Sequence, residues 1–388
     1  MRILHVVPYY TEAWAYGGIP RLASAMARAL AARGHDVTVC TTDVADAGTR
    51  ASARPRTSDG VDVRVFPNLS NRAAYQWQLF TPIGLRRFLR GRAASFDVCH
   101  IHACHNFPSV IAAKEMTRAE VPYVVSPNGT ALRIERRRVA KLLFDNVFGR
   151  GLLQHARRVL AVTESERRQL RRAGVKEQQI ALLPNPLDLR EFNHDPDGAR
   201  FRRAWQLGDN RLVLYLGKVT PRKGVDALVR AARHFRAVDT RIVIAGNEMG
   251  AGSAFHRALR SAGSDVRVTR VGLLRGLDRL DALAAADVVV YPSRDEIFGL
   301  VPLEALLCGR PVVVCNDSGC AEVIGRTGGG LTVPYGDEVA LACAIDTVLA
   351  HSALWTTKAR DAAPRVRTLF GADAVCARLQ TVYEEVCA

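Results

Sequence analysis

Residues 291–314 read YPSRDEIFGLVPLEALLCGRPVVV, and this stretch gives the strongest indication of the fold of the chain. The apolar run 288–291 has the length and β-branched content of a buried strand, and a polar loop follows it. A helix then begins near Pro302, because proline is tolerated in a first turn, where its missing N–H costs nothing. After Gly309, residues 312–315 form a second apolar run. Strand, helix and strand in this order predict a βαβ unit of a parallel sheet.

The loop and the start of this helix carry candidate binding groups. The N–H groups of Gly299, Leu300 and Val301 have no helical partners, so with the helix dipole they form an anion site that would suit a diphosphate. Glu304 is placed to accept hydrogen bonds from a ribose diol, and Glu296 would reach a bound sugar. Two isolated glutamates would instead favour another interpretation, in which Glu296 is a local cap and Glu304 only complements the dipole.

The alternation of strands and helices runs along the whole chain. Strand-like runs lie at 3–7, 37–40, 61–66, 98–101, 121–126 and 158–162, and again at 212–216, 241–245, 266–271, 288–291, 312–315 and 331–333. The rhythm pauses between 184 and 209, a polar region rich in proline and aspartate. We therefore predict an α/β protein with two Rossmann-like, doubly wound domains facing a central cleft, where the carboxyl ends of the strands bind ligands.

Composition limits the class of protein and its partners. A chain of 388 residues is long enough for two cores. No apolar run reaches the roughly 18 residues of a membrane span, and the N-terminal stretch is too interrupted for a signal peptide. Nine scattered cysteines without a Cys-x-x-Cys pair indicate reduced thiols, so we expect a cytoplasmic protein. The net charge of +16 indicates nucleic acid, an anionic membrane surface or anionic small substrates.

Two more motifs extend the pattern. GKVTPRKG at 217–224 follows the first strand of the second half, and Gly17-Gly18 precedes the first helix. With the stretch 291–314, whose two glutamates are spaced E-x7-E, they resemble segments of glycosyltransferase family 4. The resemblance covers nearly the whole chain. It implies the GT-B fold and a hexosyltransferase-type reaction (EC 2.4) from a nucleotide-diphosphate sugar, with retention of anomeric configuration and no metal or other cofactor.

The resemblance also assigns residues. Catalytic roles fall on His102, Lys223 and Glu296. The donor site falls on Gly18, Lys218, Lys223, Leu273, Glu296, Phe298, Gly299, Leu300 and Glu304, and the acceptor side on Gly17, Asn128 and Gly129. Lys223 matches the family's lysine that neutralises the diphosphate. Lys218 stands where the family usually has arginine, so a bidentate grip becomes a point-charge contact.

His102 ends the strand in DVCHIH (97–102) and resembles the family's histidine that contacts the donor sugar. Two alternatives stay open, a packed structural histidine and a zinc site that would use the nearby Cys99, Cys104 and His105. No spacing here matches a structural zinc pattern, so we expect no metal. The D-x-D match at 195–197 lies in the predicted linker and is interpreted as incidental.

By this resemblance, residues 1–190 form an acceptor-binding domain, 191–209 a linker, 210–370 a nucleotide-sugar-binding domain and 371–388 a terminal helix. The expected acceptor is a lipid-linked glycan of surface polysaccharide biosynthesis. A small natural-product acceptor is the second interpretation, and a GT-B sugar-nucleotide epimerase, a phosphorylase with pyridoxal phosphate and a noncatalytic membrane-binding protein are rivals.

An arginine-rich stretch, 133–172, alternates with apolar residues in the manner of one or two basic amphipathic helices. Two interpretations stay open. It docks on the inner face of the cell membrane, which would bring the enzyme to a lipid-linked acceptor, or it packs on its own domain with a solvated basic face. Nucleic acid is not expected, because no known binding module or set of stacking aromatics accompanies the charge.

Overall fold

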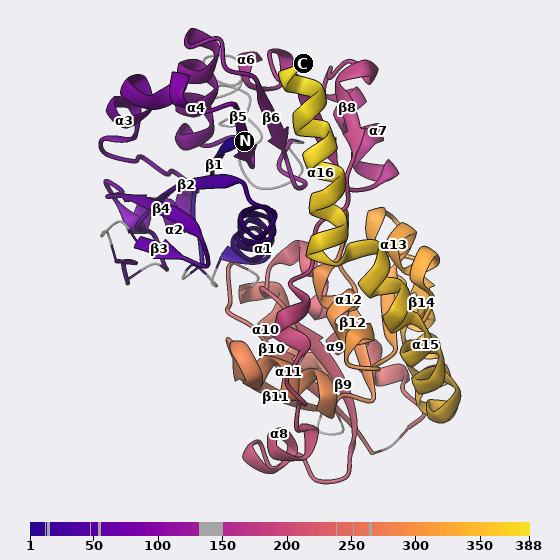
Figure 1. The fold of residues 1–388 in the computed structure, drawn as a ribbon. Helices are drawn as coiled ribbons and strands as arrows, with labels where there is room; N and C mark the ends of the chain where they lie inside the picture. Colours follow the sequence, from indigo (N-terminus) through magenta and orange to yellow (C-terminus); the bar gives the residue numbers. More distant parts are fainter. Residues whose placement is uncertain are drawn as a thin grey trace. The chain divides into compact units, whose positions relative to one another are not determined.

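The computed structural model describes residues 1–388 except 12, 14–15, 47, 53–55, 132–149, 238, 251 and 264–265. The chain forms two compact units. Unit 1 contains Met1–Asp188 and Ala372–Ala388, and unit 2 contains Leu189–Gly371. Each unit is a mainly parallel sheet with helices packed on it (Figure 1). Two α/β domains are therefore confirmed, and each unit is described by itself.

The sheet of unit 1 has the strand order β3-β4-β2-β1-β5-β6-β7-β8. Its strands are β1 (Arg2–Val6), β2 (Asp36–Thr42), β3 (Arg56–Ser58), β4 (Val61–Phe66), β5 (Val98–His102), β6 (Tyr123–Ser126), β7 (Arg158–Ala161) and β8 (Ile180–Leu182). All neighbours are parallel except β3 and β4. The chain order reverses at β1, which lies between β2 and β5, so the gap between β1 and β5 is the switch point where such sheets bind ligands.

Helices of unit 1 cover this sheet and supply two cores. They are α1 (Ile19–Ala32), α2 (Asn71–Trp77), α3 (Leu85–Arg92), α4 (Phe107–Arg118), α6 (Arg150–Gln154), α7 (Glu164–Arg172) and α16 (Ala372–Cys387). One core contains Leu22, Met26 and Leu30 of α1 with Leu379 of α16. The other contains residues of α3 and α4. The central strands β1, β2, β5 and β6 are buried along nearly their whole length, as is typical of a parallel sheet covered on both faces.

The terminal helix α16 belongs to unit 1, although 183 residues of unit 2 separate it from the rest of that unit. It lies beside α1 (Figure 1). Val375, Leu379 and Tyr383 are completely buried in the core that α1 shares. An isolated apolar stripe cannot stabilise a helix in water, so this burial explains why the segment folds here.

Unit 2 has the strand order β11-β10-β9-β12-β13-β14, all parallel. Its strands are β9 (Arg211–Leu216), β10 (Thr240–Ala245), β11 (Arg267–Gly272), β12 (Val288–Tyr291), β13 (Val312–Cys315) and β14 (Gly330–Val333). Its helices are α8 (Gly198–Ala204), α9 (Val225–Ala231), α10 (Gly252–Ser261), α11 (Gly276–Ala285), α12 (Leu300–Leu307), α13 (Gly319–Thr327), α14 (Glu338–Ala350) and α15 (Ser352–Phe370). Here the switch point lies between β9 and β12.

The segment 191–209 differs from the linker that the sequence suggested. It contains α8, which packs on α11, and it lies within unit 2. Arg200 forms an ion pair with the buried carboxylate of Asp281. The D-x-D residue Asp197 is the N-cap of α8 and accepts a hydrogen bond from the N–H of Arg200 at 3.0 Å. Aspartate and proline in this stretch therefore mark the start of a helix.

Among the described residues, no single helix combines the length and the apolar composition that a membrane span requires. Helices α14 and α15 reach that composition only as a pair, and the chain bends by 93° at the break between them.

Candidate active site

Lys223, Tyr291 and Glu296 come together at the switch point of unit 2. Lys223 follows β9, whereas Tyr291 ends β12 and Glu296 lies in the loop after it. The ammonium of Lys223 donates a hydrogen bond to the Tyr291 hydroxyl at 2.6 Å and forms an ion pair with Oε2 of Glu296. The Lys223 and Glu296 side chains are only 12% and 15% exposed. The structure thus brings two of the three predicted catalytic residues into contact.

Glycine makes this approach possible. Gly224 has φ +65°, and a Cβ added to it would lie 2.1 Å from the carbonyl oxygen of Pro292. A side chain at 224 would therefore push the loop after β9 away from the loop after β12. The preceding loop is also anchored, because the hydroxyl of Tyr215 donates a hydrogen bond to the carbonyl oxygen of Lys218 at 2.6 Å.

The charges of this cluster are coupled. Burial alone would raise the pKa of Glu296, but the nearby Lys223 and Arg222 outweigh it and hold that pKa below the ordinary value. Burial, followed by the charge of Glu296, raises the pKa of Tyr291 well above its usual range, so its hydroxyl stays protonated. The cluster therefore holds one carboxylate, one ammonium and a neutral hydroxyl within hydrogen-bonding reach.

The loop after Glu296 ends at a positive-φ glycine. Gly299 has φ +81° and is the N-cap of α12, and a Cβ there would lie 2.5 Å from Sγ of Cys320. The Glu296 carbonyl oxygen accepts hydrogen bonds from the N–H of Cys320 at 2.8 Å and from Oγ of Ser318 at 2.7 Å. These bonds fix the loop, so the first turn of α12 keeps a defined direction. Leu300, which begins α12, is partly exposed.

The side chain of Phe298 lies in the core, and its predicted place in the donor site stays a prediction. Its ring is buried and packs edge-on against Phe370, with ring centroids 5.4 Å apart. Its side chain therefore belongs to the core of unit 2. Leu273, just after the carboxyl end of β11, is exposed, and Lys218, just after that of β9, is partly exposed.

Glu304 is completely buried and has a partner that sequence reasoning missed. Arg279 of α11, itself almost fully buried, forms ion pairs with Glu304 and with Glu191, the latter at 2.6 Å. The sequence could have predicted this ion pair, because Arg279 lies on the same apolar helical face as Leu283 and Ala286. An arginine on such a face requires a buried partner. The predicted contact of Glu304 with a ribose stays a prediction.

In unit 1, the predicted glycines begin helix α1 beside the switch point. Gly17 has φ +95°, and Gly18 is the N-cap of α1. Within the described part of the chain, no side chain caps this helix end, and Pro20 occupies its first turn. The remaining N–H groups of this turn are the sort of donors that bind anions.

His102 lies in a buried layer with His5 and His100. Nδ1 of His5 and Nε2 of His102 form a hydrogen bond of 3.0 Å, while His100 bonds through Nδ1 to the hydroxyl of Tyr383 at 2.6 Å and through Nε2 to Oγ of Ser126 at 2.7 Å. Burial lowers the pKa of His5 to about 3. Burial, followed by neighbouring histidines, lowers the pKa values of His100 and His102 well below the ordinary value. All three rings are therefore neutral.

Nitrogens of these three histidines lie within 4.8 Å of one another, so we tested the layer as a metal site. Four of the six ring nitrogens already have the hydrogen bonds described above, and a metal would have to replace them. Nε2 of His5 and Nδ1 of His102 are buried without a hydrogen-bond partner among the described residues. Hydrogen bonding explains the layer better than metal ligation, and the expectation of no metal stays a prediction.

The predicted acceptor residues are tied to a buried carboxylate that the predicted site left out. Asn128 and Gly129 have φ +51° and +76°. Glu166 of α7 accepts hydrogen bonds from the N–H of Gly129 at 2.6 Å and from the N–H of Val162 at 2.9 Å. Burial outweighs these donors and raises the pKa of Glu166 to about 7. Glu166 therefore holds the loop after β6 in place.

The basic stretch 133–172 is described only in part. Residues 133–149, including Arg133, Arg136, Arg137, Arg138 and Lys141, lie outside the described residues. In the described remainder, Arg167 pairs with Glu164 and Glu177, and Arg171 pairs with Glu177. These pairs are exposed, as in a solvated helix face.

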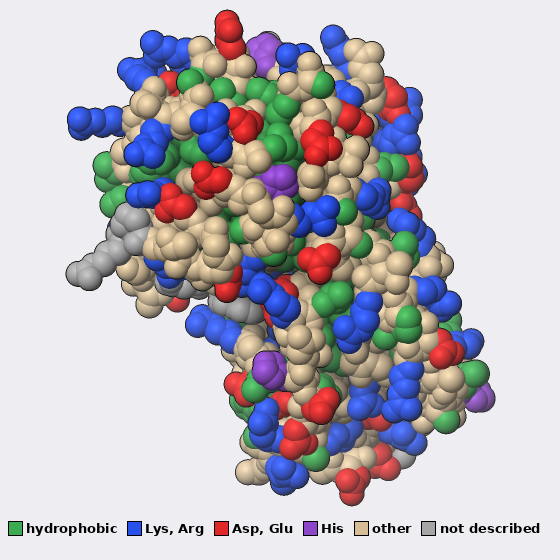
Figure 2. Space-filling model, in the orientation of Figure 1, with side chains coloured by type: hydrophobic (Ala, Val, Ile, Leu, Met, Phe, Trp, Pro, Cys, Tyr) green, Lys and Arg blue, Asp and Glu red, His purple; other side chains and the backbone are tan. Residues whose placement is uncertain are grey.

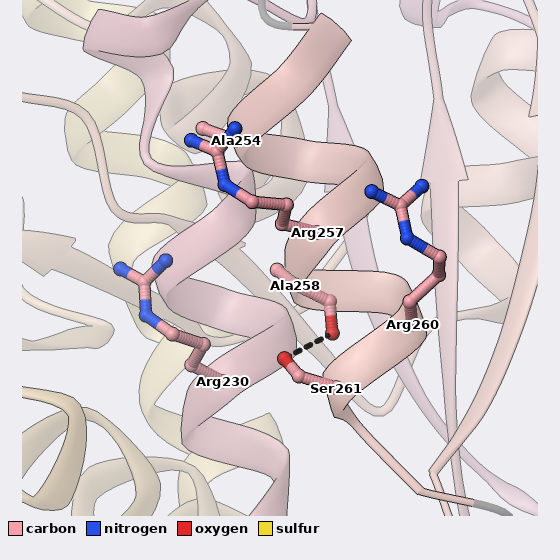
Figure 3. Close-up of a pocket in the computed structure, with 6 residues that line it drawn as sticks. All are labelled: Arg230, Ala254, Arg257, Ala258, Arg260 and Ser261. Atoms are coloured by element: carbon pink, nitrogen blue, oxygen red, sulfur yellow. Dashed lines mark hydrogen bonds between the residues drawn. The ribbon is translucent and has the colours of Figure 1, made fainter.

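One shallow pocket of about 540 Å³ lies between α9 and α10 and involves none of the predicted site residues (Figure 3). Its lining is Arg230, Ala254, Arg257, Ala258, Arg260 and Ser261. Arg230 is neutralised by Asp226 and Glu338. This pocket therefore does not form part of the predicted site, which is assigned to the switch points of the two sheets.

Comparison with known proteins identifies the family. Residues 17–186 match the model described as a glycosyl transferase 4-like domain, and residues 210–351 match that of glycosyl transferases group 1. A D-inositol 3-phosphate glycosyltransferase of Acidothermus cellulolyticus is 29% identical over 363 residues, covering 86% of this chain and 78% of that protein.

A GDP-mannose-dependent alpha-(1-6)-phosphatidylinositol monomannoside mannosyltransferase of Mycolicibacterium smegmatis is 37% identical over 185 residues, covering 43% of this chain and 46% of that protein. The chain spans about half the length of several curated relatives that it matches. HepE of Anabaena, solved with UDP and glucose, superposes with a TM-score of 0.76 at 19% identity over 99% of each chain, which shows a shared fold. The chain therefore belongs to the family 4 glycosyltransferases of the GT-B fold.

Proposed function

We propose that the protein transfers a sugar from a nucleotide-diphosphate sugar to an acceptor, with retention of anomeric configuration and without a bound metal. The observation that carries this proposal is the cluster of Lys223, Tyr291 and Glu296 at the switch point of unit 2. Support also comes from relatives named as glycosyltransferases and from a solved neighbour that contains UDP and glucose.

The donor diphosphate would lie between Lys223, Lys218 and the first N–H groups of α12. As the bond between the sugar and the phosphate breaks, its electron pair stays on the phosphate oxygen, where negative charge develops. A preorganised ammonium and backbone N–H groups aimed at that oxygen lower the barrier most. Lys223 would exchange its ion pair with Glu296 for one with the phosphate, which would place its charge where the bond breaks.

Retention follows if the acceptor attacks from the side that the phosphate leaves. The acceptor hydroxyl gives its proton to the departing phosphate oxygen, and its own oxygen forms the new bond to the anomeric carbon. Glu296 would bind hydroxyls of the sugar, and the family resemblance assigns a sugar contact to His102 as well. Nδ1 of His102 has no hydrogen-bond partner among the described residues. The neutral state of this histidine layer suits contact with a sugar, because an uncharged ring does not compete with Lys223 for the phosphate.

For the acceptor we propose a lipid-linked glycan, which places the enzyme at the inner face of the cell membrane. The name of the mycobacterial mannosyltransferase contains a lipid acceptor, which supports this choice. A small natural-product acceptor is the alternative, and turnover without any acceptor would instead indicate an epimerase.

A thermal-shift panel with UDP, GDP, ADP, TDP and their sugar conjugates tests the donor. One nucleotide should raise the melting temperature, because a ligand at 100 times its Kd stabilises the fold by about 2.7 kcal/mol. Lys223→Gln should lower kcat by about 100-fold or more, whereas the exposed Lys114→Gln is the matched control. No shift with any nucleotide, or equal turnover of both variants, would refute the proposal.

A further inference from the structure

An exposed apolar cluster lies at the carboxyl edge of the unit 1 sheet. It contains Leu69, Trp77, Leu79 and Ile83, which are 70%, 52%, 40% and 57% exposed. These residues follow β4, whose carboxyl end leads directly into the segment. Large apolar side chains are normally exposed singly, so four of them within 15 residues indicate a surface that meets a partner.

Backbone geometry places two members of the cluster on one face. Asn68 and Pro82 form an antiparallel bridge, with hydrogen bonds from Leu69 N–H to the Thr81 carbonyl and from Ile83 N–H to the Pro67 carbonyl. Side chains alternate along such a pair, and Asn68 is buried. Leu69 and Ile83 therefore both point outward on the opposite face.

The cluster rests on a rigid base. Phe80 is buried, and its ring lies 5.2 Å from that of Tyr9 and 5.8 Å from that of Tyr16, measured between centroids. These tyrosines and Ala74 of α2 form a small core under the segment. Tyr16 directly precedes Gly17, so the base of the cluster is continuous with the predicted acceptor side of unit 1.

Positive charge accompanies the apolar residues along the segment. Residues 67–92 contain five arginines and no aspartate or glutamate. Arg86 and Arg90 share the buried carboxylate of Glu115. Arg72 and Arg87 are exposed, and neither has an ion-pair partner in the part of the chain that the structure describes. Figure 2 shows basic side chains with hydrophobic ones between them over the part of unit 1 that contains α3.

We propose that this surface, formed by Leu69, Trp77, Leu79 and Ile83 with Arg72 and Arg87, docks on an anionic lipid bilayer. Apolar side chains enter the boundary between headgroups and acyl chains, tryptophan favours that depth, and arginines attract anionic headgroups. The segment 67–92 has no acidic residue, which suits a uniformly anionic surface, whereas a protein partner would present charges of both signs. The inference deepens the proposed function, since a lipid-linked acceptor would approach the acceptor side from this surface.

Vesicle flotation of the full chain tests the proposal, with vesicles of phosphatidylcholine alone or with one third phosphatidylglycerol. We expect binding to the anionic vesicles that weakens as salt is raised. Trp77→Ser with Ile83→Ser should lower the affinity by roughly tenfold or more. Arg87→Gln should lower it by roughly fivefold. These positions are exposed, so melting temperatures should stay unchanged.

Matched controls come from unit 2. Leu354→Ser removes an equally exposed leucine, 53% exposed, and Arg260→Gln removes an exposed arginine. Equal losses in the controls, equal binding to neutral vesicles, or no effect of the surface variants would each overturn the proposal. The nucleotide thermal shift separates the two hypotheses. If the protein binds vesicles but no nucleotide raises its melting temperature, only the proposed function is refuted. If a nucleotide raises the melting temperature but vesicles are not bound, only the docking surface is refuted.

Discussion

The buried histidine layer makes unit 1 sensitive to acid. His5, His100 and His102 are fully buried and neutral, with pKa values well below the ordinary value near 6.5. In the unfolded chain each takes up a proton at its ordinary pKa. For a base whose folded pKa is lowered, the stability is present above the unfolded pKa and is lost as pH falls from there toward the folded pKa.

The magnitude follows from proton linkage. Between about pH 7 and about pH 5.5, keeping a buried histidine such as His5 neutral costs about 1 kcal/mol, and His100 and His102 act in the same direction. Glu166 acts in the opposite direction, because its raised pKa stabilises the folded state by about 1–2 kcal/mol on the same change. Three histidines oppose one carboxyl group, so the net effect of the four groups is a loss of stability of unit 1 as pH falls.

A His5→Gln variant isolates one histidine. Hydrogen exchange of the amides of β1 and β5 reports the opening free energy of unit 1 alone, once it is corrected for the pH dependence of intrinsic exchange. Wild type should lose about 1 kcal/mol more than His5→Gln between the two pH values. An equal loss in both proteins would show that His5 is not held neutral, and the reasoning about the layer would fail.

Three further predictions concern single contacts. Arg279→Met should destabilise unit 2 by about 3–5 kcal/mol in urea unfolding, because it leaves the buried carboxylate of Glu304 without its cation. Adding Glu304→Gln should restore part of the lost stability. A cost below about 1 kcal/mol for Arg279→Met would contradict the buried pair. Gly224→Ala should cost more stability than Gly34→Ala, which has a similar positive φ but open space around it, and equal costs would show that the contact with Pro292 relaxes freely. The stability that Glu166 contributes is lost as pH rises from about 4.5 to about 7, so Glu166→Gln should gain more stability than wild type over this range, and a gap between the two proteins that does not change with pH would disprove the raised pKa of Glu166.

The sequence predicted local features correctly where neighbouring residues determine them. The run from β12 through Gly299 into α12 follows from apolar periodicity and from the backbone demands of glycine, both of which act within a few residues. The alternation of strands and helices along the chain predicted two α/β domains for the same reason. By contrast, 191–209 has the composition of a linker, but a long-range ion pair and packing on α11 bring it into unit 2.

Contacts between distant segments were decided only by the tertiary structure. Lys223 and Glu296 are 73 residues apart, and they meet because β9 and β12 are neighbours at the switch point. Tyr383 is 283 residues from His100 and reaches it because α16 returns to unit 1. Sequence periodicity specifies which face of each element is apolar, but it carries no information on which faces meet, since any apolar face gains free energy from burial against another. The order of the strands in each sheet determines which faces meet, and therefore which residue each buried charged side chain contacts.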